Sequence, residues 1–279
     1  MTTPDPRGPV LEVEGLRKTF GDVVAVAGVD LTLHAGGALA VVGQSGSGKT
    51  TVARMIVGLE RPAAGRITAC GRDRSRPARS ARERRRRGGE VQIVFQDPYS
   101  SLDPRQSPAS AVEEVLRLHT SLDAAGRRGR VAELAGLVGL DERQMAAAPS
   151  RLSGGQRQRV AIARALAAEP RVLILDESVA ALDVSIQAQV LNVLADVRER
   201  TGVAYLFISH DLAVVRQVTD DVVVMRGGAI VERGPTARVL DAPAHPYTRL
   251  LRESVPRPGW RPARRALRAG QDDELKESR

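Results

Sequence analysis

The chain has 279 residues, and its 42 Lys and Arg residues against 33 Asp and Glu residues give a net charge of +9. Hydrophobic residues make up 42% of the chain and charged residues 27%, values typical of a globular protein, which exclude disorder of the whole chain. The single cysteine, Cys70, excludes a disulfide framework, a multi-cysteine zinc site and a cysteine-ligated iron–sulfur cluster. The basic balance allows nucleic acid or an anionic membrane surface as a partner.

The apolar segments do not fit a secretory signal or a membrane span. Residues 1–10 are rich in proline and contain no apolar core segment. The longest uncharged stretch, residues 31–48, contains a histidine, a glutamine and five glycines, and is therefore too polar for a lipid-spanning helix. We expect a soluble chain whose membrane role comes through a partner.

Apolar and polar residues alternate between residues 11 and 33, which predicts short strands separated by turns. Three wholly apolar runs then predict buried parallel strands: Leu39–Val42, Val172–Leu175 and Val203–Ile208. Between the last two, residues 184–200 carry apolar side chains at helical spacing. Strands that alternate with helices predict an α/β fold with a mainly parallel sheet, and such sheets bind ligands at the carboxyl ends of their strands.

Three further segments depart from this alternation. Residues 108–168 carry helical patterns and no convincing strand, so we predict a helical insertion there. Residues 222–226 and 229–233 predict a hairpin that turns at Gly227 and Gly228. Residues 256–279 are rich in Pro, Arg and Glu, which predicts a disordered basic tail after a domain that spans residues 10–255.

A glycine-rich segment follows the first apolar run and precedes a helical pattern. It fits the phosphate-loop pattern and consists of Gly43, Gln44, Ser45, Gly46, Ser47, Gly48, Lys49 and Thr50. The glycines let backbone N–H groups point at phosphate oxygens, Lys49 brings a positive charge to the β- and γ-phosphates, and Thr50 offers a hydroxyl to Mg²⁺. We count the next residue, Thr51, among the ATP-binding residues as well. A plain Gly/Ser-rich turn would not explain why one of only three lysines stands at the required position.

Two carboxylates end the second apolar run. Asp176 is placed to hold Mg²⁺ through its water shell, and Glu177 is placed to orient or deprotonate an attacking water. An acidic pair at the start of a helix is also common without any function. The phosphate loop upstream favours the catalytic interpretation.

Further motifs give the chain a family resemblance. Residues 152–156 and the helical pattern after them resemble the signature motif of ATP-binding cassette (ABC) ATPases. The other parts of that pattern appear in the family's order: Gln96 resembles the Q-loop glutamine, Asp183 the D-loop aspartate and His210 the switch histidine. The resemblance covers about residues 10–255. It implies an α/β fold with a P-loop ATPase core, an N-terminal antiparallel β subdomain and an inserted helical subdomain.

The same resemblance implies roles for single residues. Glu177, His210 and Gln96 would be catalytic, and Thr50, Gln96 and Asp176 would hold Mg²⁺. Phe20 stands where the family stacks an aromatic ring on the adenine of ATP. An aromatic residue beside a strand end is, however, often only part of a core.

The signature segment adds a second phosphate-binding end. Ser153, Gly154, Gly155 and Gln156 precede a long helical pattern, so they are expected at a helix N-terminus with free N–H groups. In the family, two ATPase subunits meet head to tail, and the phosphate loop of one subunit faces the signature of the other. The resemblance also implies that Asp183 belongs to the nucleotide-binding residues.

One departure from the family pattern concerns the residues after Glu177. The family usually continues with Pro, then Thr or Val, then Ser, whereas this chain has Ser178, Val179 and Ala180. The catalytic residues are retained, but the geometry of the turn before Asp183 is open to question. We expect activity that is altered without being abolished.

Three longer runs, residues 95–105, 182–192 and 244–251, resemble the ATPase subunits of dipeptide/oligopeptide importers, a group that includes nickel and glutathione importers. The resemblance implies a second ATPase subunit, identical or different, and two membrane-spanning permease subunits. An extracytoplasmic substrate-binding protein would act indirectly. The chain would then lie at the cytoplasmic face of the cell membrane. The sequence leaves the transported cargo open.

Residues 72–87 hold nine arginines in sixteen residues, which read alone suggests nucleic acid or anionic lipid. We prefer a solvated loop, because in the family that the chain resembles this region is variable and exposed. The lack of interleaved aromatic residues further weakens the case for binding of single-stranded nucleic acid. A nucleic-acid-linked ABC ATPase is the main alternative function, but the chain lacks the zinc cysteines and the second cassette of that class, and we expect no nucleic-acid partner. A non-enzymatic regulator would not need the complete set of Lys49, Asp176, Glu177 and His210.

Overall fold

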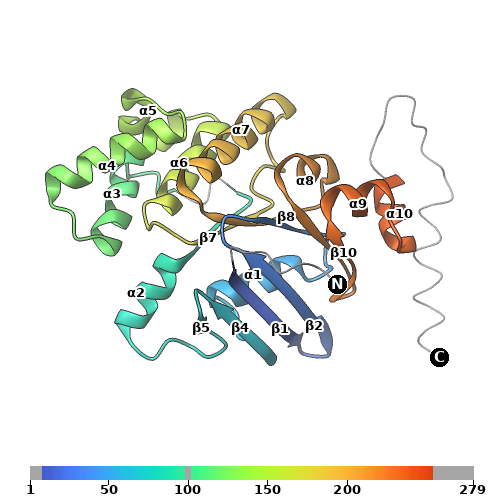
Figure 1. Cartoon of the computed structure of the whole chain (residues 1–279). Coiled ribbons are helices and arrows are strands. Elements are labelled where there is room, and N and C mark those ends of the chain that lie inside the picture. Colours follow the sequence, from blue (N-terminus) through green and yellow to red (C-terminus); the bar gives the residue numbers. More distant parts are fainter. Residues whose placement is uncertain (1–7, 98–101, 254–279) are drawn as a thin grey trace.

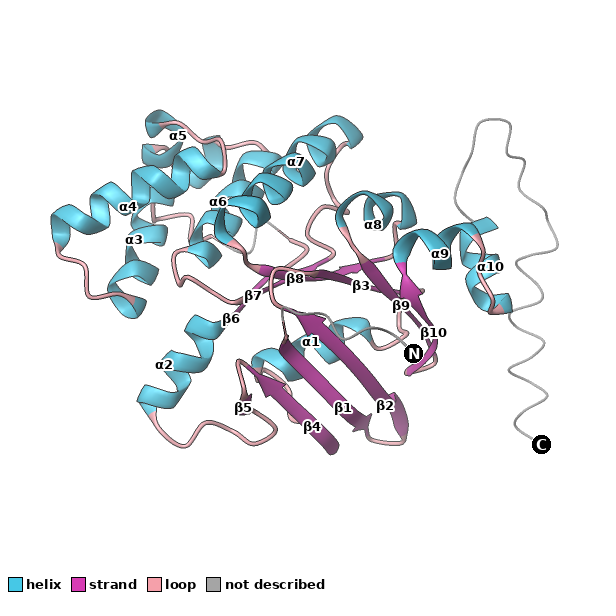
Figure 2. Ribbon diagram, viewed as in Figure 1, coloured by secondary structure: helices cyan, strands magenta, loops and turns pink. Residues whose placement is uncertain are grey.

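The two β-sheets of the protein lie on either side of helix α1 (Lys49–Val57), as Figures 1 and 2 show. The computed structural model describes residues 8–97 and 102–253. The smaller sheet is antiparallel, in the order β2-β1-β4-β5, and is built from β1 (Pro9–Phe20), β2 (Val23–His34), β4 (Ala64–Ala69) and β5 (Arg72–Asp73). This sheet is the expected N-terminal antiparallel subdomain.

The larger sheet has six strands in the order β10-β9-β3-β8-β7-β6. Its strands are β3 (Ala38–Val42), β6 (Val91–Val94), β7 (Val172–Asp176), β8 (Ala204–Ser209), β9 (Asp221–Arg226) and β10 (Ala229–Pro235). All neighbours are parallel except β9 and β10, which form the predicted antiparallel hairpin. The expected α/β fold with a mainly parallel sheet is confirmed.

The central strands are wholly apolar because both of their faces are buried. In β7, Leu173 and Leu175 pack into one core cluster with the outer helices, while Val172 and Ile174 pack into the other with α1 and the antiparallel sheet. Alternate residues of a strand point to opposite faces, so each such strand serves two cores.

Most helices cover the face of the large sheet that lies away from α1 (Figure 1). They are α3 (Pro108–His119), α4 (Ala124–Leu137), α5 (Glu142–Ala146), a 3₁₀ turn (Pro149–Arg151), α6 (Gly154–Leu166), α7 (Val184–Thr201), α8 (Leu212–Val218), α9 (Thr236–Asp241) and α10 (Pro246–Glu253). Residues 108–168 contain helices and no strand, all of them within the described ranges, as the sequence predicted. The predicted disordered tail, residues 256–279, lies outside the described residues.

The prediction of short strands in residues 11–33 is wrong in detail. β1 and β2 each run for 12 residues and pair along most of their length. The register shifts between Val13 and Leu16, where Gly15 adopts a φ of 55°. Such a bulge interrupts the alternation of side chains without ending the strand, and the sequence pattern therefore looked like a break.

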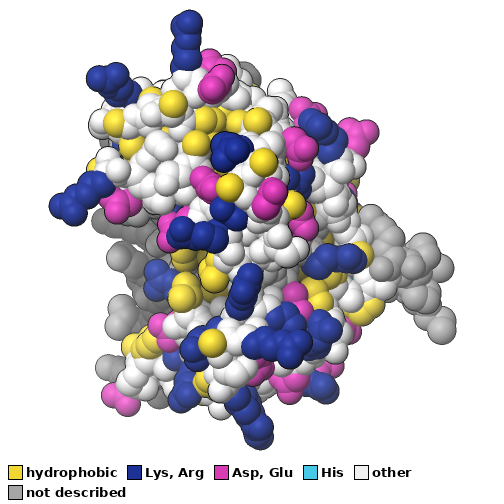
Figure 3. All heavy atoms as spheres, turned by 90° about the vertical axis from the view of Figure 1, so that its left-hand side faces the viewer, with side chains coloured by type: hydrophobic (Ala, Val, Ile, Leu, Met, Phe, Trp, Pro, Cys, Tyr) yellow, Lys and Arg dark blue, Asp and Glu magenta, His cyan; other side chains and the backbone are white. Residues whose placement is uncertain are grey.

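The interpretation of residues 72–87 as a solvated loop is right only in part: residues 74–80 form a loop and most of the arginines are exposed, but the remaining residues are regular structure. The second part forms helix α2 (Ala81–Glu90), whose N-cap Ser80 accepts a hydrogen bond from the Glu83 N–H at 3.1 Å. Arg74 is only 7% exposed and bonds to Glu90 at 2.6 Å. These contacts hold the segment in place. Figure 3 shows Lys and Arg side chains gathered in the lower half of the face that carries α2.

No helix within the described ranges is sufficiently long and apolar to cross a membrane.

Candidate active site

Polar residues gather at the carboxyl edge of the large sheet, where four parallel strands end side by side. In sheet order, the phosphate loop follows β3, His210 follows β8, Asp176 ends β7 with Glu177 directly after it, and Gln96 follows β6. The strand register pairs Val42 with Ser209 and Asp176 with Ile208, so the ends are aligned. The topology thus places the predicted phosphate, metal and catalytic residues at one edge of the sheet.

Two glycines of the phosphate loop have no room for a side chain. At Gly43, whose φ is 155°, a Cβ would lie 2.3 Å from the Met225 carbonyl oxygen. At Gly48, whose φ is 100°, a Cβ would lie 2.3 Å from the Ala25 carbonyl oxygen. The loop therefore passes tightly between β2 and the β9–β10 hairpin, with a backbone conformation that favours glycine.

Helix α1 begins directly after this loop with its first-turn donors open. Gly48 is the N-cap, and no described side chain caps the helix. Lys49 is buried, and its Nζ donates to the carbonyl oxygens of Gly43 and Gln44, both at 2.8 Å. Burial lowers the pKa of Lys49, and the nearby carboxylates of Glu177 and Asp176 oppose that shift. An uncapped helix start and a sheltered ammonium group together form an anion-binding site.

The Thr50 hydroxyl and the Asp176 carboxylate lie next to each other, since Thr50 Oγ1 donates to Asp176 Oδ1 at 3.1 Å. Burial raises the pKa of Asp176, opposed by the Thr50 hydrogen bond. Hydroxyl and carboxylate oxygens are ligands that Mg²⁺ prefers, usually with phosphate oxygens and water completing its shell. The pair therefore fits a Mg²⁺ ion bound together with a nucleotide. Among the described residues, no group of three or more His, Cys, Asp and Glu side chains could hold a metal alone.

Glu177 adopts a backbone conformation that is rare for a non-glycine residue, with a φ of 48°. Its N–H donates to the Ile208 carbonyl oxygen at 2.9 Å, which ties it to the end of β8. His210 Nδ1 lies 3.4 Å from Glu177 Oε1. Strained backbone is often found at active sites, where surrounding contacts hold a reactive side chain in place. A carboxylate and an imidazole in contact can together orient and deprotonate a water molecule.

The turn after Glu177 is regular despite the unusual residues there. The Ala180 N–H donates to the Glu177 carbonyl oxygen at 3.1 Å, and the Leu182 N–H donates to the Val179 carbonyl oxygen at 3.2 Å. Ser178 and Val179 are buried. The turn therefore closes through backbone hydrogen bonds, and Asp183 is the N-cap of α7.

The signature segment forms a second cluster, at the start of α6. Ser153 is the N-cap in a reciprocal capping box: its Oγ accepts from the Gln156 N–H at 3.3 Å, and its N–H donates to Gln156 Oε1 at 2.9 Å. A Cβ at Gly155 would lie 2.3 Å from Ile186 Cγ2, so α6 begins against the start of α7, next to Asp183. Within the described ranges, no hydrogen bond or ion pair joins this cluster to the phosphate loop.

Two predicted residues lie at the margin of the site. Gln96 is exposed just after β6, next to residues that lie outside the described ranges. Phe20 is 47% exposed at the end of β1, with Lys18 Nζ 4.7 Å from its ring centroid. It pairs with Val23 across the hairpin, whose second strand continues to Ala25 beside Gly48. The ring therefore has a free surface near the loop.

Sequence reasoning missed one contact of the phosphate loop. The Gln44 N–H donates to the hydroxyl of Tyr247, a residue of α10, at 3.1 Å. Tyr247 stood within a run that we used only to identify the family branch. No local pattern could signal a contact between residues that are 203 positions apart.

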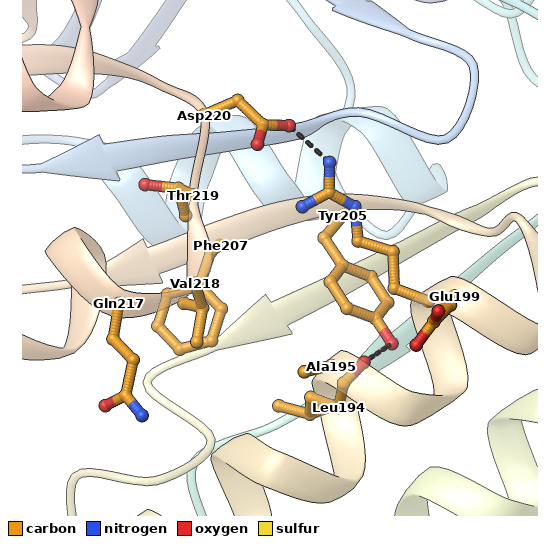
Figure 4. A pocket seen from close by; sticks show the side chains of 10 residues that line it. Leu194, Ala195, Glu199, Tyr205, Phe207, Gln217, Val218, Thr219 and Asp220 are labelled. Atoms are coloured by element: carbon orange, nitrogen blue, oxygen red, sulfur yellow. Dashed lines mark hydrogen bonds and ion pairs between the residues drawn. The ribbon is translucent and has the colours of Figure 1, made fainter.

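A cavity of about 300 Å³ between α7, β8 and the segment after α8 is separate from this edge (Figure 4). Its wall contains the Arg198–Asp220 ion pair, and the Tyr205 hydroxyl donates to the Leu194 carbonyl oxygen at 2.8 Å. The residues of the predicted site do not line it.

Comparison with known proteins agrees with this geometry. Residues 26–180 match the family described as ABC transporter, and residues 231–278 match the family described as oligopeptide/dipeptide transporter, C-terminal region. The solved structure of cbiO1 from Clostridium perfringens has a TM-score of 0.76 at 27% identity, covering 96% of this chain and 99% of that chain. The cassette MJ0796, solved as a dimer bound to ADP and Pi, has a TM-score of 0.72 at 27% identity, covering 81% of this chain and 98% of that chain.

Curated relatives are more similar in sequence. The oligopeptide transport ATP-binding protein OppF of Lactococcus lactis is 43% identical over 235 residues, 84% of this chain and 73% of that protein. The di/tripeptide transport ATP-binding protein DppF of Pseudomonas aeruginosa is 46% identical over 242 residues, 87% of this chain and 74% of that protein.

The chain belongs to the ABC transporter family and is an ABC ATPase, as the carboxyl-edge site and the fold indicate. Its C-terminal region is of the oligopeptide/dipeptide-transporter type.

Proposed function

We propose that this chain hydrolyses ATP to drive the import of dipeptides or oligopeptides through partner membrane subunits. The observation that carries the proposal is the combination of an ABC cassette with the C-terminal region described for oligopeptide/dipeptide transporters in one chain. The relatives named for oligopeptide and di/tripeptide transport support it.

ATP would bind at the phosphate loop and the start of α1, with Lys49 countering the charge of the β- and γ-phosphates. Thr50 and Asp176, with Gln96 reaching in from β6, would hold Mg²⁺, which neutralises charge that develops on the phosphate oxygens. Glu177 would take a proton from the attacking water, and His210 would hold the water or the γ-phosphate in place. Phe20 would stack on adenine, and Thr51 would offer a further donor in the first turn of α1.

Two copies, or this chain and a related subunit, would form a head-to-tail dimer. The start of α6, with Ser153, Gly154, Gly155 and Gln156, would then face the phosphate loop of the other subunit, and Asp183 would lie at the same interface. Two features support this: the capping box satisfies only the Ser153 and Gln156 N–H groups, which leaves those of Gly154 and Gly155 for a phosphate, and the two clusters lie on different helices of one chain. The similar cassette MJ0796 was solved as a dimer.

The assembly would include two permease subunits and place the chain at the cytoplasmic face of the membrane, with a substrate-binding protein on the far side. Residues 99–102 carry no charge and include an aromatic residue, as an interface core requires, which makes them a candidate groove for a permease helix. Residues 99–101 lie outside the described ranges, and Leu102 is only 6% exposed and belongs to the core. Leu102 therefore does not present an open surface, while Phe95, which is 37% exposed, does.

The nucleic-acid alternative finds no support. Its sequence argument was the arginine run, and part of that run forms helix α2, with Arg87 paired to Glu83 and Arg74 paired to Glu90. The solved relatives are transporter cassettes.

The test is peptide uptake in membrane vesicles that contain this chain, its two permease subunits and the binding protein. A labelled dipeptide or oligopeptide should accumulate only with ATP, and Lys49→Ala should abolish accumulation. Accumulation of nickel or glutathione in place of peptide would keep the ATPase role and reject the peptide cargo. ATP hydrolysis stimulated by nucleic acid and not by the permease subunits would reject the transport role.

A further inference from the structure

The first amide after Gly43 in the phosphate loop has an unusual partner. The Gln44 N–H donates to the Tyr247 hydroxyl at 3.1 Å, and the Tyr247 side chain is buried, with 5% of its surface exposed. The contact joins the nucleotide site to α10, which lies beside the β9–β10 hairpin (Figure 1). The contact is half-buried although Gln44 itself is exposed, and the Tyr247 hydroxyl gives this N–H an acceptor within the protein.

Tyr247 is itself held by a chain of hydrogen bonds. Its N–H donates to His245 Nδ1 at 3.1 Å. The preceding turn is anchored to β10, because Glu232 accepts from the N–H groups of Ala244 at 2.8 Å and His245 at 3.1 Å. The Arg226 guanidinium lies 5.2 Å from the centroid of the tyrosine ring. The position of the hydroxyl is therefore fixed by the sheet.

The same hairpin also holds the other side of the loop. The Gly228 N–H donates to the Ser47 carbonyl oxygen at 3.2 Å, and the Met225 carbonyl lies where only a glycine fits, at Gly43. The loop is thus hydrogen-bonded to the β9–β10 turn through Gly228 and to α10 through Tyr247, and it packs against β9 at Met225. With these contacts in place, the remaining N–H groups of the loop are free to point at phosphate oxygens.

We propose that Tyr247 is a positioning residue for the nucleotide site: its hydroxyl fixes the Gln44 peptide and so preorganises the phosphate loop for ATP. The C-terminal segment His245–Tyr247 then contributes to ATP binding by positioning the phosphate loop. The proposal rests on ATP binding at the phosphate loop. Without the hydroxyl, the Gln44 N–H must turn toward another acceptor, and part of the binding free energy goes into restoring the loop.

The experiment compares two tyrosine-to-phenylalanine variants of the full chain. Tyr247→Phe keeps the ring and its contact with Arg226 and removes only the hydroxyl. Tyr205→Phe is the matched control, because it removes a buried tyrosine hydroxyl that donates to Leu194, in the cavity of Figure 4. The readouts are the Kd of ATP by equilibrium titration, the kcat and KM of ATP hydrolysis, and the midpoint of thermal unfolding.

We expect Tyr247→Phe to weaken ATP binding about 3- to 10-fold, as the loss of one hydrogen bond predicts. KM should rise by a similar factor with kcat nearly unchanged, while Tyr205→Phe should lower the unfolding midpoint without a change in Kd. Glu232→Gln, which weakens the anchor of the turn at a distance from the loop, should raise Kd in the same direction.

Equal Kd values for wild type and Tyr247→Phe, with strongly weakened binding in Lys49→Ala, would overturn the role of Tyr247 alone. Equal weakening in Tyr247→Phe and Tyr205→Phe would show a general effect on stability and also overturn it. Unchanged binding in Lys49→Ala would reject the phosphate loop as the nucleotide site, and with it the role of Tyr247.

Discussion

Helices α1 and α6 begin in opposite ways, although both starts are predicted to bind the phosphates of ATP. α1 starts at a glycine N-cap with a φ of 100°, and no described side chain occupies its first-turn donors. α6 starts at Ser153, whose side chain and the Gln156 side chain cap each other's backbone N–H groups. The first helix start is open, and the second has already satisfied part of its donors.

This difference indicates which of the two helix starts can bind the nucleotide without a second subunit. The start of α1 lies beside Lys49, Thr50 and Asp176, so charge and metal ligands converge there within one chain. The start of α6 is capped by Ser153 and Gln156 and packs against the Ile186 side chain. A partly capped end adds little affinity by itself, but can complete a site that a second subunit supplies.

Replacing the proposed general base should stabilise the ATP-bound dimer, in which the start of α1 of one subunit faces the start of α6 of the other. Glu177→Gln keeps the shape of the side chain but cannot accept a proton, so hydrolysis should fall by about 10²- to 10⁴-fold while ATP binding persists. With Mg²⁺ and ATP the variant should elute from a sizing column as a dimer, and with ADP as a monomer. Turnover close to wild type in the assembled complex would show that Glu177 is not the base.

A pair of glycine substitutions separates the two helix starts. Gly48→Ala places a Cβ 2.3 Å from the Ala25 carbonyl oxygen at a φ of 100°, which should weaken ATP binding at least about 10-fold. Gly155→Ala places a Cβ 2.3 Å from the Ile186 side chain, which can shift. It should leave ATP binding by the isolated chain unchanged and reduce hydrolysis in the dimer. Equal loss of ATP binding in both variants would show that α6 contributes to the site within one chain.

Loss of the cap of α6 should have a smaller effect. Ser153→Ala removes the acceptor for the Gln156 N–H, which costs about 1 kcal/mol of stability at a helix N-terminus. The midpoint of chemical unfolding should fall accordingly, while the Kd of ATP for the isolated chain stays the same. If Kd also rises, the capped end and the open end are coupled within one subunit.

Local sequence patterns predicted the phosphate loop before α1 and the buried strands of the large sheet, because short segments of the chain determine both features. The phosphate loop depends on the conformation of a few consecutive residues, and the buried strands are apolar throughout since they face two cores. The Gln44–Tyr247 contact depends on how α10 folds back beside β10, and no short pattern encodes that path. The helix α2 was missed for another reason: the segment was interpreted only from its charge and its place in the family pattern. Ser80 with Glu83 three positions later is a helix-start signal that could have revealed it.

The smallest effect is expected at α2, a third helix start, which lies away from the carboxyl edge. Ser80 caps its first turn, and Glu83 accepts from the Arg79 N–H at 2.8 Å. Both hydrogen bonds close this helix start, as in α6 and unlike in α1. Replacing Arg84 and Arg85 with Ser should therefore leave ATPase activity within about 2-fold, since solvent-exposed charges contribute little to stability. Arg87→Ser is the informative contrast. Arg87 bonds to the Arg76 carbonyl oxygen at 2.6 Å and to Glu83 at 2.5 Å, so its loss should lower the unfolding midpoint while the exposed pair leaves it unchanged. A large loss of ATPase activity in the Arg84 and Arg85 variant would show that this charged surface acts on the nucleotide site after all.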